Sequence, residues 1–354
     1  WVPHMVFMAH ADWMHNGDAE WQRTRYEALK EKLLQDRVSS DGWVMSNAKQ
    51  READDIVDWP KTERDGFVFR EVNTVVNAFH IAAVMKMVEL ARATGHEADA
   101  ESYASRAREL TGRFNRELYL RGKGAYRDGI GTDHAASHAS LFPLAFGLVP
   151  DDQVAAVSTY LTNRGMACSV YAAQYLLEGL FQIGADKAAL DLITAKGDRS
   201  WRHMFESGTT ITWEAWDQKY KPNQDWNHAW GAAPANLLPR FVLGAQPLEP
   251  GWKNARIAPL PGALKQAKGR IPTPRGPIEI HWIRDSSFHL KMDLPEGMGA
   301  KVILPSNAPS DQVWMDGAKI AFTRQGSRLV VDELVSGSRK FMVKTNPIIR
   351  VSSE

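Results

Sequence analysis

Residues 73–119 carry the pattern that decides the fold, as two consecutive helices of opposite character: NTVVNAFHIAAVMKMVELARATG (73–95) and EADAESYASRARELTGRFNRELY (97–119). The first is apolar on most faces and ends at Thr94-Gly95, a usual C-terminal signal. The second carries charges along one face, as a surface helix does. This pairing predicts two layers, with the apolar helix buried on both sides.

The same alternation continues along the chain. HAASHASLFPLAFGL (134–148) and SVYAAQYLLEGLFQIG (169–184) are apolar, and amphipathic helices follow at 150–165 and 185–197. We expect one helix over 3–17, another over 18–37 and a last one over 230–244, roughly nine or ten in all before residue 247. Because no sequence period marks a solenoid, residues 1–246 are predicted to form an (α/α) barrel.

From residue 247 the pattern changes to short runs with alternating apolar and polar residues. Examples are RGPIEIHWIR (275–284), SFHLKMDLP (287–295) and AKVILPS (300–306). Period-two alternation broken by Gly, Pro, Asn or Asp indicates antiparallel strands. We therefore expect a small antiparallel β-sandwich domain in residues 247–354.

The composition excludes several classes of partner. The chain has 354 residues with 43 basic and 42 acidic side chains, so its net charge of +1 predicts no binding to nucleic acid or an anionic membrane. No apolar run reaches the roughly 18 residues of a membrane span. Cys168 is the only cysteine, which does not distinguish cytosol from periplasm. No phosphate-binding glycine loop or dinucleotide motif is present, so no cofactor is expected.

The chain opens with Trp1, in a segment typical of the middle of a helical protein. A closed barrel of six helical hairpins needs more helices than the sequence predicts here. We therefore expect that an N-terminal segment of the same protein, including the first hairpin, lies outside this chain.

The chemistry concentrates in ITWEAWDQKYKPNQDWNHAW (211–230), which places Trp213, Trp216, Trp226 and Trp230 beside several acids and His228. Sugars are held in this way, because rings stack on the apolar face of a pyranose while acids bind its hydroxyls. Indoles around Glu214 would also desolvate its carboxyl and change its pKa. The alternative is a core tryptophan cluster whose acids pair with Lys219 and Lys221.

DIVDWPKTERDG (55–66) repeats that composition with Asp58, Trp59, Glu63 and Arg64. The alternative here is a loop folded on its own salt bridges, with Glu63 and Arg64 exposed. Two loops rich in acids and indoles on one helical scaffold favour a binding site.

Two histidines, His134 and His138, are four residues apart, which puts them on one face of a helix. No third potential ligand lies at a sequence spacing typical of a metal site, so we expect no metal site here. His134 is kept as a candidate for substrate binding.

TTITWEAWD and DWNHAWGA, followed by PLEPGWKNARIAP, resemble the bacterial α-L-rhamnosidases of glycoside hydrolase family 78. The likeness runs along nearly the whole chain and is most specific over 209–257. It implies an (α/α)6 barrel with β-sandwich domains, and an inverting hydrolase of terminal α-L-rhamnosyl residues.

The resemblance also implies roles for single residues. Glu214 matches the general base, His228 a residue that contacts the sugar, and Trp59 a ring that lines the rhamnose pocket. The family's general acid lies in a motif N-terminal to this chain, so either that acid is outside the chain or Glu63 replaces it. The candidates for substrate binding are Asp58, Trp59, Glu63, Arg64, His134, Trp213, Trp216, Trp226 and His228.

Two other functions remain open from the sequence. One is a carbohydrate-binding module that keeps the aromatic pocket but lacks a complete pair of acids. The other is a different (α/α)-barrel glycosidase, or a lyase, that acts on an acidic polysaccharide with Arg64 and His228.

Overall fold

The structure, a computed structural model, describes residues 2–53, 55 and 57–345, and divides into two compact units. The first unit holds residues 1–11 and 19–234 and is helical. The second holds residues 12–18 and 235–354 and contains the β-sandwich. Part of the predicted β-domain, residues 346–354, lies outside the described residues.

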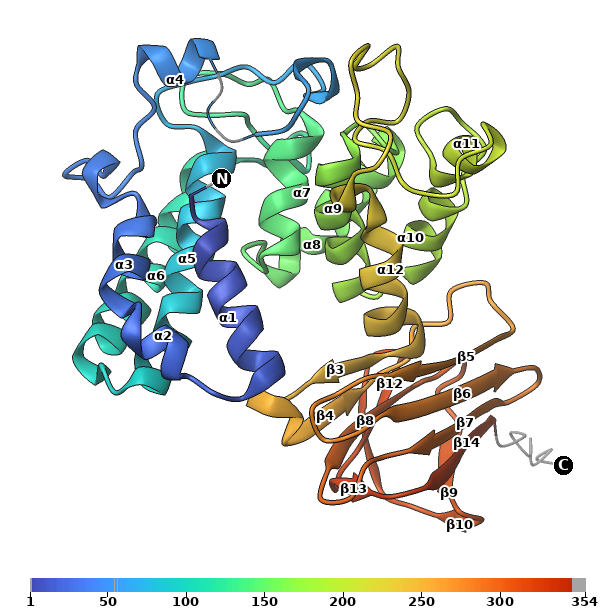
Figure 1. Ribbon diagram of the computed structural model, residues 1–354. Helices are drawn as coiled ribbons and strands as arrows, with labels where there is room; N and C mark the ends of the chain where they lie inside the picture. The colour runs from blue at the N-terminus through green and yellow to red at the C-terminus, as the bar shows by residue number, and fades with distance from the viewer. Residues whose placement is uncertain (1, 54, 56, 346–354) are drawn as a thin grey trace, which may run out of the picture. The chain divides into compact units, whose positions relative to one another are not determined.

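The helical unit has the two predicted layers (Figure 1). Its inner helices contact one another, and each packs against the outer helix that follows it in the chain. The contrast in burial is strong, since every residue of α7 is buried whereas α8 buries only Val157 and Leu161. The inner helices are α5 (Thr74–Thr94), α7 (Ser137–Ala145) and α9 (Val170–Gln182), and the outer ones are α6 (Glu97–Leu118), α8 (Asp151–Arg164) and α10 (Asp186–Ile193).

Local signals in the sequence set the ends of α5. The Asn73 side chain accepts hydrogen bonds from the backbone N–H groups of Val75 and Val76, which caps the helix start. Gly95 ends the helix with φ of 85°, a left-handed conformation that glycine adopts without a steric penalty.

α5 is also long and apolar enough to cross a membrane by length and composition, which the sequence analysis did not recognise. Within the protein, 78% of its most apolar window is buried. Its surface is therefore covered by neighbouring helices, as in the core of a protein.

Two predicted single helices are divided in the structure. The segment 18–37 forms α2 (Glu20–Thr24), α3 (Tyr26–Lys30) and the 3-10 turns η1 (Glu31–Leu33) and η2 (Gln35–Arg37), interrupted at Leu34 with φ of 57°. The segment 230–244 forms η4 (Ala229–Ala232), α12 (Ala233–Leu237) and the π-type turn η5 (Leu238–Leu243). Pro234 and Pro239 lack the backbone N–H that a continuous α-helix needs there.

The remaining elements of the helical unit are short, apart from α1, which follows the predicted bounds. They are α1 (His4–Asn16), α4 (Ala48–Ala53), η3 (Lys61–Glu63), α11 (Trp201–Glu206) and the two-stranded ribbon β1 (Tyr119–Leu120) with β2 (Ala125–Tyr126).

The second unit is a sandwich of two sheets, with strand orders β10-β9-β14-β7-β6-β5 and β11-β12-β8-β4-β3, and with β13 also paired to β8. Alternation along β7 buries Phe288, Leu290 and Met292, as predicted. The pairing of β4 with β8 is parallel, however, whereas the sequence indicated antiparallel strands throughout. The strands are β3 (Ala245–Pro247), β4 (Asn254–Ile257), β5 (Gln266–Ile271), β6 (Ile278–Arg284), β7 (Phe288–Asp293), β8 (Gly299–Pro305), β9 (Asp311–Met315), β10 (Ala318–Lys319), β11 (Phe322–Gln325), β12 (Arg328–Val331), β13 (Val335–Ser336) and β14 (Arg339–Thr345); η6 (Pro250–Trp252) lies between β3 and β4.

Candidate functional site

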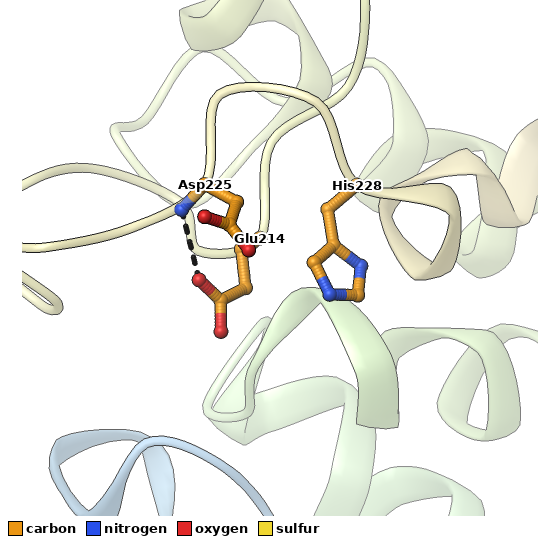
Figure 2. Close-up of side chains that lie close together, drawn as sticks. All are labelled: Glu214, Asp225 and His228. Atoms are coloured by element: carbon orange, nitrogen blue, oxygen red, sulfur yellow. Dashed lines mark hydrogen bonds between the residues drawn. The ribbon is translucent and has the colours of Figure 1, made fainter.

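The tryptophan loop, residues 211–230, folds back on itself through paired backbone hydrogen bonds. Glu214 N–H donates to Asp225 O at 3.0 Å, and His228 N–H donates to Thr212 O at 2.9 Å. These bonds bring Glu214, Asp225 and His228 to one side of the loop, where their side chains point toward the same region (Figure 2). Gly231 is required beside them, because a Cβ there would lie 2.5 Å from Trp213 O.

The two oxygens of the Glu214 carboxyl differ in their contacts, because only Oε2 contacts donors among the described residues. Oε2 accepts a hydrogen bond from Asp225 N–H at 2.9 Å and lies 2.9 Å from the Lys221 ammonium. Oε1 accepts no hydrogen bond within the part of the chain that the structure describes. Burial opposes ionisation, but the bonds from Lys221 and Asp225 and the nearby charges of Lys221 and His228 outweigh it, so the pKa of Glu214 is lowered.

His228 stands directly before η4, as the sequence predicted. Its ring stacks on Trp230 with centroids 4.3 Å apart, and Trp230 in turn contacts the ring of Tyr171 at 5.6 Å. Nδ1 of His228 is buried and has no hydrogen-bond partner among the described residues. The imidazole is thus held by ring contacts rather than by a hydrogen bond at Nδ1.

Glu214, Asp225 and His228 form a group that the sequence analysis did not recognise as possible metal ligands. One ligand atom from each lies within 4.8 Å of the others. The ammonium of Lys221 already neutralises Glu214 at Oε2, and its positive charge opposes a cation at the same place. The arrangement therefore suits hydrogen bonding to a neutral ligand better than it suits a metal ion.

The tryptophans of this loop divide into core and surface. Trp216 is fully buried and donates from Nε1 to Cys168 O at 2.7 Å, and Trp213 is only 5% exposed. The burial of these two rings favours the core-cluster alternative for them over direct contact with a sugar. Trp226 is 48% exposed, with its ring edge-on to Trp213 at 4.8 Å.

Three of the charged side chains in residues 58–64 are more deeply buried than either sequence interpretation predicted. Asp58, Glu63 and Arg64 are all at most 7% exposed, and Arg64 donates from Nε to Asp58 O at 2.8 Å. Asp58 and Glu63 expose only 2% and 1% of their surface, whereas Arg64, at 7%, is as buried as Glu214, so its contact with a substrate stays a prediction. Trp59 is the exception, with 36% of its surface exposed.

The loop around residues 58–64 is tied to the tryptophan loop. Thr62 donates from Oγ1 to Tyr220 O at 2.8 Å, and the Arg199 guanidinium lies over the Tyr220 ring at 4.4 Å. Arg199 also donates to Glu63 Oε1 at 3.2 Å. The structure therefore joins the two loops that the sequence singled out, at the same end of the inner helices (Figure 1).

Burial raises the pKa of Glu63 to about 7, although the Arg199 charge acts in the opposite direction. A raised carboxyl pKa means that the folded state binds the proton more tightly than the unfolded chain does. The stability that this provides is present below about pH 4.5 and is lost as the pH rises to about 7, by roughly 3 kcal/mol. We expect Glu63→Gln to remove this pH dependence from the free energy of unfolding.

Urea denaturation of both proteins between pH 4.5 and 8 measures that difference. Glu101→Gln, an exposed glutamate on α6, is the matched control and should follow the unaltered protein. Parallel stability curves for the unaltered protein and Glu63→Gln would show that the pKa of Glu63 does not differ between the folded and unfolded states.

The two predicted histidines do not share a helix face. His134 precedes α7 and pairs with Asp128, Nδ1 to Oδ2 at 2.6 Å, whereas His138 lies inside α7 and is fully buried against Asp58. The prediction that both lie on one helix is wrong because α7 begins only at Ser137. His134 keeps 42% of its side chain exposed, and its contact with a substrate stays a prediction.

A cavity of about 480 Å³ opens elsewhere in the helical unit, and sequence analysis did not predict it. Its walls combine polar and apolar groups with charges of both signs, and Glu214 does not line it. The lining residues are Asp36, Arg37, Val38, Ser39, Met45, Ser46, Asn47, Ala48, Gln50, Arg51 and Glu71.

Comparison with known proteins places these features in one family. Residues 1–242 match the bacterial α-L-rhamnosidase six-hairpin glycosidase domain, and residues 244–318 match the bacterial α-L-rhamnosidase C-terminal domain. A curated α-L-rhamnosidase from Alteromonas sp. (strain LOR) is 25% identical over 71% of this chain. The match spans only 29% of that relative's length.

Solved structures agree with this fold. An α-L-rhamnosidase structure from Dictyoglumus thermophilum has a TM-score of 0.78 and 22% identity, and covers 98% of this chain and 39% of its own. The Streptomyces avermitilis α-L-rhamnosidase, solved with L-rhamnose, has a TM-score of 0.77 and 21% identity, and covers 96% of this chain and 32% of its own. Both show the predicted fold, a six-hairpin barrel followed by a β-sandwich.

Proposed function

Because this chain belongs to the bacterial α-L-rhamnosidase six-hairpin glycosidase family, we propose that it hydrolyses terminal α-L-rhamnosyl bonds with inversion, using Glu214 as general base. The observation that carries this proposal is the state of the Glu214 carboxyl. Lys221 and Asp225 hold Oε2 and lower the pKa, while Oε1 is open among the described residues. Such a group is ionised at neutral pH and can take a proton from a water molecule.

Around this base, exposed aromatic rings and an imidazole supply sugar recognition. Trp226 follows the Asp225 contact directly, and Trp59 lies in the loop that is tied to the tryptophan loop. In this proposal the rings pack on the apolar face of the rhamnosyl unit and His228 binds a hydroxyl.

The second carboxyl of the mechanism is not Asp225. Inverting glycosidases keep their two carboxyls about 6.5–9.5 Å apart to admit the water. Carboxyl oxygens of Glu214 and Asp225 lie within 4.8 Å of each other, too close for that arrangement. Glu63 is only 1% exposed, and the match spans only 29% of a curated α-L-rhamnosidase, so we propose, following the family resemblance, that the general acid is supplied by a part of the protein outside this chain.

The test is an assay of this chain, and of the chain extended at its N-terminal side, on an aryl α-L-rhamnoside. Inversion is followed by ¹H NMR, and the expected first product is the β-anomer of L-rhamnose. Appearance of the α-anomer first would overturn the inverting mechanism. Binding of L-rhamnose without turnover in either form would instead support a carbohydrate-binding module.

Lys221 should set the acidic limit of this activity. Lys221→Met removes the ammonium that lowers the pKa of Glu214, so this pKa rises and the acid limb of the kcat/KM profile moves to higher pH. Lys219→Met is the matched control, because Lys219 lies on the same loop but pairs with Asp198. An acid limb that stays in place in Lys221→Met would show that Glu214 does not control it.

A further inference from the structure

Asp58 is a buried carboxyl with both oxygens occupied by the protein. Oδ1 accepts from Trp59 N–H at 2.8 Å and from the Ser169 hydroxyl. Oδ2 accepts from Ser169 N–H at 2.9 Å and lies 2.6 Å from Nε2 of His138. A carboxylate offers about four lone-pair positions, so these contacts leave none for a sugar hydroxyl.

The groups around Asp58 come from three segments that are distant in sequence. Trp59 lies in the loop, His138 in the first turn of α7, and Ser169 is the N-cap of α9. The Ser169 hydroxyl also accepts from the first backbone N–H groups of α9, and the positive end of that helix favours a negative charge beside it. One carboxyl thus fastens the loop to two inner helices.

The first turn of α9 also supports the other side of the proposed site. Tyr171 lies two residues after Ser169, and its ring contacts Trp230 at 5.6 Å. Trp230 is the ring on which His228 stacks. Asp58 is therefore connected through α9 to His228, and through its own backbone to Trp59.

We propose that Asp58 is a positioning residue that sets the placement of Trp59 relative to His228, and thereby the affinity for the rhamnosyl unit. This inference rests on the proposed function. Asp58 touches neither substrate nor Glu214, so its loss should weaken binding and leave the chemical step nearly unchanged. A residue needed only for folding would instead reduce the fraction of active protein at constant affinity.

Calorimetric titration of the full chain with L-rhamnose separates these two roles, because it yields both the dissociation constant and the number of sites. Asp58→Asn keeps the size of the side chain but presents an amide to the surrounding donors. We expect its Kd for L-rhamnose to rise at least about tenfold with the number of sites unchanged. In whichever protein hydrolyses the aryl rhamnoside, this chain or the chain extended at its N-terminal side, KM should rise by the same factor. The value of kcat should change less than about threefold.

Asp311→Asn is the matched control, since Asp311 is a buried carboxyl that accepts several hydrogen bonds in the β-sandwich. It should leave the Kd for L-rhamnose unchanged. If Asp58→Asn does not fold, Ser169→Ala keeps the backbone N–H contact to Asp58 but removes the hydroxyl contact and the cap of α9, and should raise Kd by about threefold.

Two results would overturn the inference. A fall in the number of sites at constant Kd, in whichever Asp58 or Ser169 variant folds, would assign Asp58 a folding role alone. Absence of L-rhamnose binding by the unaltered chain would overturn the proposed function and this inference with it.

Discussion

Replacement of Glu214 by glutamine is expected to lower kcat for an aryl α-L-rhamnoside by about 10²–10⁴-fold, the usual contribution of a general base. Glutamine can still accept the hydrogen bonds from Asp225 and Lys221 at its amide oxygen, so the loop should keep its conformation. Only the ability to take a proton from water is lost. KM should therefore change little, because the residues proposed to hold the sugar remain in place.

The measurement compares steady-state rates of the unaltered and variant proteins. It uses this chain or the chain extended at its N-terminal side, whichever shows turnover. Glu206→Gln is the control, since Glu206 is exposed and pairs with Arg202 on α11. Turnover by Glu214→Gln equal to that of the control would exclude Glu214 as the base. Activity abolished by a chelator and restored by a divalent cation would instead assign Glu214, Asp225 and His228 to a metal ion.

Removal of the Trp216 ring should have the largest effect on stability. Trp216 has no exposed surface, packs edge-on against Trp201 at 4.9 Å and donates to Cys168 O. Trp216→Ala leaves a cavity of ring size and an unsatisfied carbonyl oxygen, so the free energy of unfolding should fall by about 3–5 kcal/mol. Urea denaturation followed by circular dichroism measures it.

Trp226→Ala is the contrasting variant, because this ring in the same loop is 48% exposed. It should change the free energy of unfolding by less than about 1 kcal/mol while weakening the binding of L-rhamnose. Equal destabilisation by the two substitutions would show that Trp226 also belongs to the core.

Local sequence was sufficient for the helices that carry their own signals. Asn73 caps the start of α5 and Gly95 ends it. The apolar composition of α5, α7 and α9 matches the burial of these helices. Prediction failed where a turn interrupts an amphipathic run. Leu34 takes a left-handed backbone within the predicted helix 18–37, and no residue of the kind that usually marks such a break stands there.

The candidate site also had features that the sequence indicated and features that it did not. Residue types in 211–230 suggested a carbohydrate site, because acids beside indoles are chemically suited to sugars, but they left a core tryptophan cluster open, and the role of Glu214 came from the family resemblance. They did not reveal that Lys221 and Asp225 N–H share one carboxyl oxygen, since that contact depends on how the loop closes.

Composition and periodicity by themselves determined that this chain is a two-layered helical barrel followed by a β-sandwich, because burial imposes those periods directly on the sequence. Only the tertiary structure decided which of these acids and rings are buried and which are exposed. Asp58 and Trp59 are neighbours of similar promise in the sequence, yet two distant segments enclose the carboxyl, whereas the indole is 36% exposed. Burial of a side chain depends on which residues pack over it. Contacts between residues as far apart as Asp58 and Ser169 cannot be predicted from the neighbouring sequence of either residue.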